Sequence, residues 1–392
     1  MKKYSMLCYV LTAMFYVVQV SVLGFTVYYL NENGYTAFEV GVLLAAFGII
    51  SAIAQRLLGY LADKYKKIDF KSILMCTSII LIILFITLYL FDKNKPIIGI
   101  LFGITFALTN CMSPFVNLSC FYYTNKGFNV DYGKARGFGS LSFSIASFIL
   151  GLYTKSFGSR AVSFNGIIFA IVFFLIVFFI PRLGNDDSED EKKNLDTRLC
   201  DISIFALIKK YPSFFLMVLA TTFAMCFQNA DCGYLIQIIK NLGEDSSALG
   251  TANAIAAIVE IPIMFSITKI MKKIKVKKLI AVACGLYVVR GIVFYIPSMP
   301  AIYLAQVMQM FTYAILIPST VYLSDEMMHN DDKNKGQTFI GMAVTVGLIF
   351  GSFVGGGLIS LGGVNLLEVG CIFIAILSFI FATIGNFIKD NC

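Results

Sequence analysis

The stretch from residue 257 to residue 265 reads Ala-Ile-Val-Glu-Ile-Pro-Ile-Met-Phe, and it places a carboxylate, Glu260, inside a long apolar run. An acid among hydrocarbon side chains costs about 2.5 to 3.5 kcal/mol on the membrane-insertion scale. Such residues therefore face a protein interior or a watery cavity and mark a pathway. We expect Glu260 to face a polar cavity that the other apolar segments of the chain build around it.

The composition agrees with a protein that crosses a membrane many times. Of the 392 residues, 58% are hydrophobic and 14% are charged, and the mean hydropathy is +0.81. These values exclude an ordinary soluble domain. The ten cysteines lie mostly within apolar runs without metal-ligand spacing, so we interpret them as buried and reduced, with no metal and no cofactor implied.

Apolar segments of about 20 residues, the length needed to cross the hydrocarbon core, recur along the whole chain. They predict an all-α membrane protein with twelve transmembrane helices arranged as two pseudo-symmetric six-helix bundles. The predicted spans are residues 6–30, 38–62, 71–92, 96–123, 134–155, 162–181, 212–239, 247–271, 277–297, 299–323, 336–360 and 364–388.

The net charge of +8 is explained by the positive-inside rule better than by nucleic-acid binding. If both termini are cytoplasmic, most Lys and Arg residues fall in cytoplasmic loops and helix ends. We therefore predict a multi-pass protein of the cell (cytoplasmic) membrane with both termini in the cytoplasm. The cations then left on the outer side are Lys93, Lys95, Lys155, Arg160 and Lys240.

One long polar connection divides the chain into two halves. We predict an N-terminal bundle of residues 1–182, a cytoplasmic linker of residues 183–211 with an interfacial helix at 202–210, and a C-terminal bundle of residues 212–392. The halves echo one another, because span five opens Lys134-Ala-Arg-Gly-Phe-Gly and span eleven opens Lys335-Gly-Gln-Thr-Phe-Ile-Gly. Two related halves are typical of a transporter whose site lies between the repeats.

Three charged residues inside spans are candidates for proton coupling. Glu260 in span eight and Arg290 in span nine fall at similar depths, so movement that changes the charge or the hydration around Glu260 could load and release a proton. A permanent structural pair between the two helices is the alternative. Asp231 in span seven lies nearer the outer side and is a second proton candidate or a gate residue.

Polar side chains at helical spacing in several spans indicate a central pocket. Each is individually more often an interhelical hydrogen bond than a ligand contact, but together they favour a solute site. The residues are Tyr16, Gln19, Asn110, Ser113, Asn117, Gln228, Asn253, Gln306, Gln309 and Tyr313. The one histidine, His329, falls in a loop beside two aspartates, so a two-histidine zinc motif is excluded.

The loop between spans two and three carries a motif that supports a family resemblance. Gly59-Tyr-Leu-Ala-Asp-Lys-Tyr-Lys-Lys resembles the cytoplasmic signature of the major facilitator superfamily. The resemblance implies a gate in which Gly59 allows close helix contact and Asp63 with the cations Lys66 and Lys67 locks the inner ends of the spans.

Within that superfamily, residues 131–140 look like the start of span five in the branch of lactose permeases and oligosaccharide or nucleoside proton symporters. The resemblance implies that Arg136 contacts substrate and pairs with an acid in span four, but the nearest position here is Asn117, which cannot form that pair. Phe143 stands where relatives place a sugar-stacking tryptophan, and Gln309 where they carry a histidine. The segments at Glu260 and Arg290 also look like this branch.

The leading hypothesis is a secondary transporter, and not an enzyme, that imports a small polar solute together with protons by alternating access. The solute would be a sugar, an oligosaccharide or a nucleoside, and the protein a monomer in the lipid bilayer. A proton-driven exporter of drugs or metabolites is an alternative, although span five lacks the Gly-Pro motif typical of exporters. An importer of aromatic or other organic acids stays open, and a receptor or intramembrane enzyme is a third class.

Overall fold

The computed structural model describes residues 2–64, 70–91, 94–125, 127–128, 130–181, 204–329, 332–388 and 390. Within these ranges the secondary structure is helical throughout, as the apolar segments predict, because a backbone in lipid must satisfy its own hydrogen bonds. The first half contains α1 (Lys2–Gln19), the π-helical segment η1 (Val20–Gly24), α2 (Thr26–Glu32), α3 (Ala37–Lys64), α4 (Phe70–Leu90), α5 (Lys95–Asn125), α6 (Tyr132–Phe157) and α7 (Arg160–Phe179). The second half contains α8 (Ile204–Lys210), α9 (Pro212–Asp231), α10 (Leu235–Asn241), α11 (Ser246–Met271), α12 (Val276–Phe294), α13 (Met299–Val307), the 3₁₀ segment η3 (Met308–Met310), α14 (Tyr313–Met327) and α15 (Lys333–Phe387).

The predicted set of membrane spans is recovered in the described residues. Ten helical stretches are long and apolar enough to cross a membrane. One of them, α15, holds two spans, because Gly362 leaves the helical conformation and Gly363 adopts a φ of 70°, a region that favours glycine. The helix α12, which carries Lys277, Lys278 and Arg290, is not among these ten stretches. Counting α12 as a span and α15 as two gives the predicted twelve.

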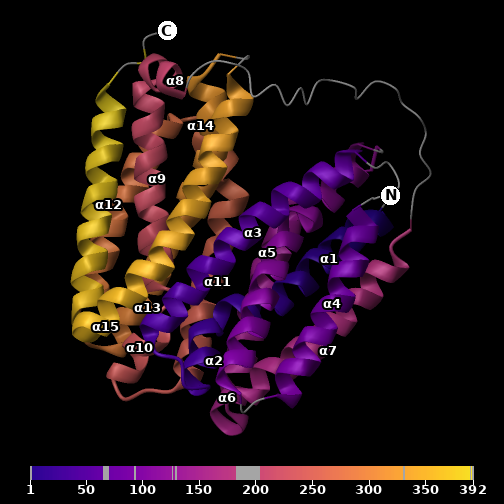
Figure 1. Ribbon diagram of the computed structural model, residues 1–392. Helices are drawn as coiled ribbons and strands as arrows, with labels where there is room; N and C mark the ends of the chain where they lie inside the picture. Colours follow the sequence, from indigo (N-terminus) through magenta and orange to yellow (C-terminus); the bar gives the residue numbers. More distant parts are fainter. Residues whose placement is uncertain are drawn as a thin grey trace.

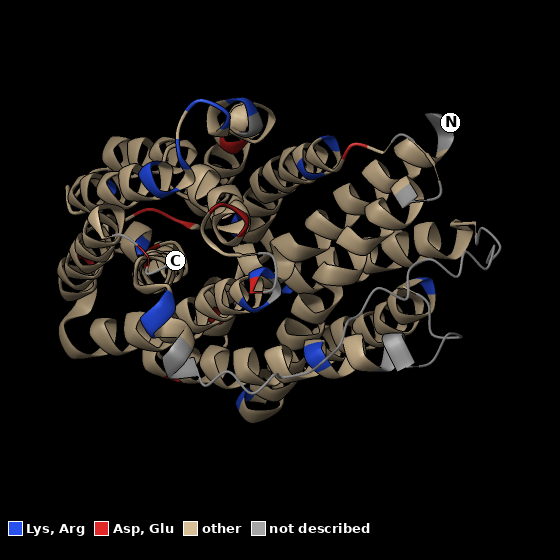
Figure 2. Ribbon diagram, turned by 90° about the horizontal axis from the view of Figure 1, so that it is seen from above, with Lys and Arg blue, Asp and Glu red and all other residues tan. Residues whose placement is uncertain are grey.

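Figure 1 shows two groups of helices, one drawn in indigo to magenta and the other in rose to yellow, and Figure 2 shows the same ribbon from above with Lys and Arg in blue and Asp and Glu in red. In the first group, α1 packs on α5, α6 and α7, and α4 packs on α5 and α7. In the second, α15 packs on α9 and α12, and α12 packs on α13 and α14. The groups meet where α3 contacts α15 and where α6 contacts α11. Many large side chains on their surfaces, such as Ile53, Ile83 and Phe373, are more than half exposed, as expected for faces that contact lipid.

Both termini lie at the same end of the molecule, which we call the terminal end (Figure 1). The other end, where α2 joins α3 and α10 joins α11, is called the opposite end. The linker prediction falls mostly on residues outside the described ranges, but α8 occupies Ile204–Lys210 within the predicted interfacial helix. The division into two six-helix bundles and a linker stays a prediction.

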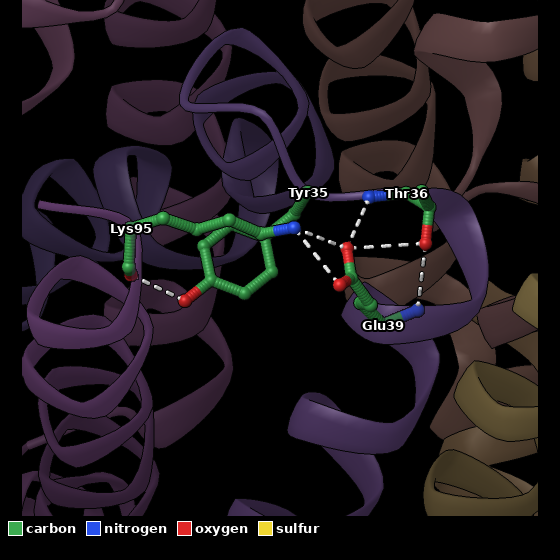
Figure 3. A network of polar contacts seen from close by, with 4 residues as sticks. All are labelled: Tyr35, Thr36, Glu39 and Lys95. Carbon is green, nitrogen blue, oxygen red and sulfur yellow. Dashed lines mark hydrogen bonds and ion pairs between the residues drawn. The ribbon is translucent and has the colours of Figure 1, made fainter.

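A local network fixes the start of α3 at the opposite end (Figure 3). The Thr36 backbone N–H donates to the Glu39 carboxylate at 2.8 Å, and the Glu39 N–H donates to the Thr36 hydroxyl at 3.3 Å. This reciprocal arrangement is a capping box, which satisfies free N–H groups at the helix start. Lys95 at the start of α5 donates to the same carboxylate at 2.8 Å, and its carbonyl accepts from the Tyr35 hydroxyl. The network therefore ties α3 to α5.

Candidate functional site

A cavity of about 500 Å³ lies between the two groups of helices. Eight of the nine predicted substrate-binding residues line it: Gln19, Arg136, Phe143, Gln228, Asn253, Gln306, Gln309 and Tyr313. Glu260 lines it too, and it is the one carboxylate among the lining residues that the structure describes. Polar amides and aromatic rings thus surround a single acid, as the stripes of polar residues predict.

Asn117 does not line the cavity, although the sequence favours it as a solute contact. Asn110 and Ser113, earlier on α5, take that place. Pro114 lies inside α5 between these positions, and Asn110 donates from its side-chain amide to the Phe106 carbonyl. Among the lining residues that the first-half helices contribute, Arg136 is therefore the one charged residue. Its guanidinium lies 4.9 Å from the centre of the Tyr16 ring.

Arg290 is fully buried on α12 and holds a network of side chains together. Its Nη1 donates to Gln228 Oε1 at 3.0 Å and to Thr312 Oγ1 at 3.2 Å. Its Nη2 donates to Gln309 Oε1 at 2.8 Å and to Gln306 Oε1 at 3.2 Å. Hydrogen bonds from charged groups are stronger than neutral ones. Arg290 therefore holds the side-chain amides of Gln228, Gln306 and Gln309 with their oxygens toward its guanidinium.

Gln309 connects Arg290 to Glu260. Its Oε1 accepts from Arg290, and its Nε2 donates to Glu260 Oε1 at 2.7 Å. The sequence predicts a response of Glu260 to Arg290 but leaves the nature of the contact open. The structure shows no direct ion pair between Glu260 and Arg290. The side-chain amide of Gln309 bridges them by hydrogen bonds to both.

The 3₁₀ segment η3 is what places Gln309 there. Span ten is interrupted between α13 and α14, and Gln309 lies in the interruption, 9% exposed. Breaks in membrane helices are tolerated where the freed backbone is buried in protein or lines a cavity. Span one is interrupted by the π-helical segment η1, and span seven is interrupted between α9 and α10. The apolar runs predict continuous spans, and these breaks appear only in the structure.

Asp231 lies behind this network, at the end of α9. Its side chain is 1% exposed, and neither carboxylate oxygen has a hydrogen-bond partner among the described residues. Asp231 does not line the central cavity. The structure therefore separates Asp231 from the cavity that Glu260 faces.

Several residues of this region are missed by the sequence analysis. Cys232 receives a hydrogen bond from Arg290 Nη2 at 3.1 Å, and Asn229 lines the cavity one turn from Met225. Glu368 in the last span is 6% exposed. The signal for Glu368 is the one that singles out Glu260, an acid within an apolar run, Leu-Leu-Glu-Val-Gly.

The predicted gate motif, Gly59 to Lys67, lies partly outside the residues that the structure describes. Gly59 lies in α3, and a side chain added there would meet no atom within 4 Å. The side chain of Asp63 and residues Lys66 and Lys67 lie outside the described part of the chain. Because the loop that follows α3 lies outside the described ranges, the close helix contact at Gly59 that the resemblance implies stays a prediction.

The two groups of helices are joined by polar contacts at the opposite end. Asn253 donates to the Gly24 carbonyl at 3.0 Å, and the Tyr234 hydroxyl donates to the Ser352 carbonyl at 2.8 Å and lies 3.3 Å from the Ala37 carbonyl. Two ion pairs also cross between the groups, Lys155 with Asp245 at 2.9 Å and Lys240 with Glu32 at 2.7 Å. Hydrogen bonds from Ser247 and from Lys155 lower the pKa of Asp245 to about 2.

Glycines allow the helices to cross closely at this end. A Cβ added at Gly250 of α11 would lie 2.5 Å from the Ser147 carbonyl oxygen of α6. A Cβ added at Gly356 of α15 would lie 2.4 Å from the Ala37 carbonyl oxygen of α3. Because no side chain fits in either crossing, these contacts close the opposite end below the cavity.

A fold of this kind, with an acid and an arginine buried around a central cavity, defines a membrane transporter. Solved structures agree with this class. The nucleoside transporter NupG superimposes with a TM-score of 0.77 at 16% identity, covering 98% of both chains, and a variant of it with 0.82 at 14% identity, covering 98% of this chain and 99% of that one. The POT family transporter PepTSo gives 0.69 at 12% identity, covering 98% of this chain and 97% of that one.

The model of the MFS_1 like family matches residues 7–367, and the chain belongs to this family. A curated relative, the uncharacterized transporter YwbF of Bacillus subtilis (strain 168), is 24% identical over 298 residues, which cover 76% of this chain and 71% of YwbF. The predicted superfamily resemblance and the all-α membrane fold are thereby confirmed, and the protein is a transporter and not an enzyme.

Proposed function

We propose that the chain imports a small polar solute together with protons, and that a nucleoside is the first solute class to test. The observation that carries this proposal is the contact of Gln309 with both Glu260 and Arg290 in the wall of the central cavity. Proton coupling needs a group whose protonation changes the contacts of the solute site. Glu260 faces the cavity, and its protonation alters the hydrogen bonds of Gln309 and, through Gln309, those of Arg290.

The charges around Arg290 support a role for one proton. Arg290 is buried, Glu260 meets its network through Gln309, and Asp231 directly precedes Cys232, to which Arg290 donates. A buried charge without compensation is costly. One cation between two carboxyl groups is balanced when one of them is ionised and the other holds a proton. This arrangement therefore favours the binding and release of a single proton as the conformation changes.

The chemistry of the cavity supports a nucleoside or a sugar. The amide of Gln19 offers donors and an acceptor for hydroxyl groups and base edges, and Asn253 offers its side-chain oxygen, since its nitrogen donates to Gly24. The rings of Tyr16 and Phe143 offer flat apolar faces. NupG, whose fold this chain shares, is described as a nucleoside transporter, which favours that class for the first test.

An organic acid is a second candidate solute. Arg136 lines the cavity, and no ion pair joins it to a carboxylate within the described ranges. A carboxylate on the solute would match the fork of donors on the guanidinium. The two candidates differ in charge, so they are separated by competition between neutral and anionic solutes for the same site.

The proposed orientation places the terminal end in the cytoplasm of the cell, as the distribution of Lys and Arg predicts. The opposite end, which the ion pairs and glycine crossings close, then faces outward. In this orientation the conformation is closed to the outside, and import requires a second conformation in which these contacts are broken.

The test is transport by the purified protein in liposomes that contain a pH-sensitive dye. We expect a nucleoside pool to acidify wild-type vesicles and the Glu260→Gln variant to stay silent while solute still raises its melting temperature. Glu244→Gln, at an exposed loop carboxylate, is the matched control and should behave as wild type. An equal response of wild type and Glu260→Gln contradicts the role of Glu260. Acidification by anionic solutes alone favours the organic acid, and solute efflux driven by an inward proton gradient favours export.

A further inference from the structure

A second cavity lies within the C-terminal helices at the opposite end, apart from the central one. Its volume is about 220 Å³, and Asn241, Tyr295, Pro297, Asn365 and Glu368 are among the residues that line it. It is bounded by the ends of α10 and α12 and by the second span of α15. None of its lining residues lines the central cavity.

Glu368 is the acid of this cavity. Its side chain is 6% exposed, and no hydrogen bond or ion pair joins it to another residue in the described ranges. Burying an ionised carboxylate without a partner is strongly unfavourable, so such a group picks up a proton or meets water. The polar side chains of Asn241, Asn365 and Tyr295 make the cavity suitable for water, which needs two to four polar partners.

Asp231 is the next buried acid toward the centre of the bundle. Asp231 ends α9, and α9 packs along α15, which carries Glu368 and the fully buried Cys371. Both oxygens of Asp231 lack a partner. Two buried donors, Arg290 Nε and Gln306 Nε2, lack one as well. Buried donors and acceptors that lack a protein partner are typical of places where ordered water binds.

The charged and titratable groups around the two acids are few. Tyr295 is the other titratable residue that lines the cavity. Cys232 follows Asp231 in the chain and accepts a hydrogen bond from Arg290, and Cys371 is buried on α15, which packs against α9. On the surface of this end, Lys240 of α10 is paired with Glu32 of the other half, and Glu244 lies exposed in the next loop. Among the described residues, no cation pairs with Glu368.

We propose that Glu368 and Asp231 form a second proton-binding site, filled from the opposite end through the smaller cavity and coupled to Glu260 through Arg290. The inference rests on the proposed proton-coupled transport. A proton from water in the cavity binds a carboxylate oxygen of Glu368 or Asp231. Loss of the negative charge on Asp231 leaves Glu260 as the counter-charge of Arg290, which strengthens the contact through Gln309. The two sites therefore oppose one another in proton binding.

The second site can bind a proton while the opposite end of the central cavity is closed. The contacts between the two halves close the opposite end of the central cavity, so in this conformation they separate Glu260 from that end. Glu368 lies inside one half and does not depend on that opening. Protons on the two sides of the membrane thus act on Arg290 from two different acids.

The first test needs no solute. Infrared difference spectra of the purified protein, recorded between neutral and acidic pH, report the C=O stretch of each carboxyl group that gains a proton. We expect Glu368→Gln to lose a band that wild type and the control Glu244→Gln retain, and Glu368→Asp to restore a shifted band. Identical spectra for wild type and Glu368→Gln would overturn the proposal.

The second test compares two transport modes of one variant. Exchange of solute across the membrane without a proton gradient reports binding and movement, and uptake driven by a proton gradient reports coupling. We expect Glu368→Gln to keep the exchange and to lose about tenfold in proton-driven uptake, which corresponds to ~1.4 kcal/mol. Unchanged proton-driven uptake and an unchanged pH profile would overturn the proposal. If wild type shows no proton-driven uptake of any solute, the proposed function fails, and the infrared spectra still decide whether Glu368 binds a proton.

Discussion

At the scale of single residues, Gln309 is the position where a small change should have the largest specific effect. We predict that Gln309→Leu uncouples transport, because the substitution removes the donor to Glu260 and one acceptor from Arg290. Leaving such buried groups unpaired costs about 1 to 3 kcal/mol. The melting temperature should fall, and proton-driven uptake should be lost more completely than exchange of solute.

Gln237→Leu is the control, since Gln237 lies on α10 outside the lining of the cavity. An unchanged ratio of proton-driven uptake to exchange in Gln309→Leu would show that Glu260 and Arg290 act without the bridge.

The residues of the central cavity are largely predictable from the sequence, because a polar side chain inside an apolar run requires a partner. That rule finds Glu260, Arg290 and the amides around them. It does not say which partner each one meets, so the bridge through Gln309 appears only in the structure. Asn117 shows the limit, since one turn of a helix separates a residue that lines the cavity from one that does not.

At the scale of helices, the crossing of α6 and α11 depends on glycine. We predict that Gly250→Ile opens the opposite end, because its Cβ would collide with the Ser147 carbonyl. Overpacking of this kind costs about 1 to 3 kcal/mol, which shifts an equilibrium between two conformations by roughly 5-fold to 150-fold. Hydrogen exchange measured by mass spectrometry should rise in the peptides that contain α2 and α10.

Gly341→Ile is the matched control on α15, since an added Cβ there meets no atom within 4 Å. Equal exchange in the two variants would mean that the crossing does not hold this end closed.

The helices themselves are predictable from length and hydropathy, and their interruptions are not. A run of apolar residues has the same composition whether it is continuous or broken, as in span ten. The break at η3 depends on partners from α11 and α12 that stabilise Gln309 and Thr312, and these contacts are remote in sequence. The turn at Gly363 differs, because glycine itself permits the positive φ.

At the scale of the whole molecule, the ion pair between Lys155 and Asp245 joins the two halves. Asp245 has its pKa lowered to about 2 from a usual value of 3.8. A carboxyl with a lowered pKa contributes stability that is present above its usual pKa and is lost as the pH falls through the lowered value. We predict that this pair does not change the closure of the opposite end between about pH 5 and pH 8.

The measurement is hydrogen exchange at this end over that range, corrected for the intrinsic pH dependence of exchange. Asp245→Asn should raise exchange only modestly, because both partners are about half exposed and surface pairs contribute about 0 to 1 kcal/mol. Asp325→Asn, which alters a pair within one half, is the control. A strong pH dependence in wild type that disappears in Asp245→Asn would contradict the prediction.

The fully buried Arg290 has a consequence for how the protein is made. When α12 leaves the ribosome, Gln228 of α9 has already been synthesised, and Gln306, Gln309 and Thr312 have not. A lone arginine at the centre of an inserted helix costs about 2.5 to 3.5 kcal/mol. The ninth span is therefore settled in the bilayer only after the tenth has emerged, and the two should be inserted as a pair.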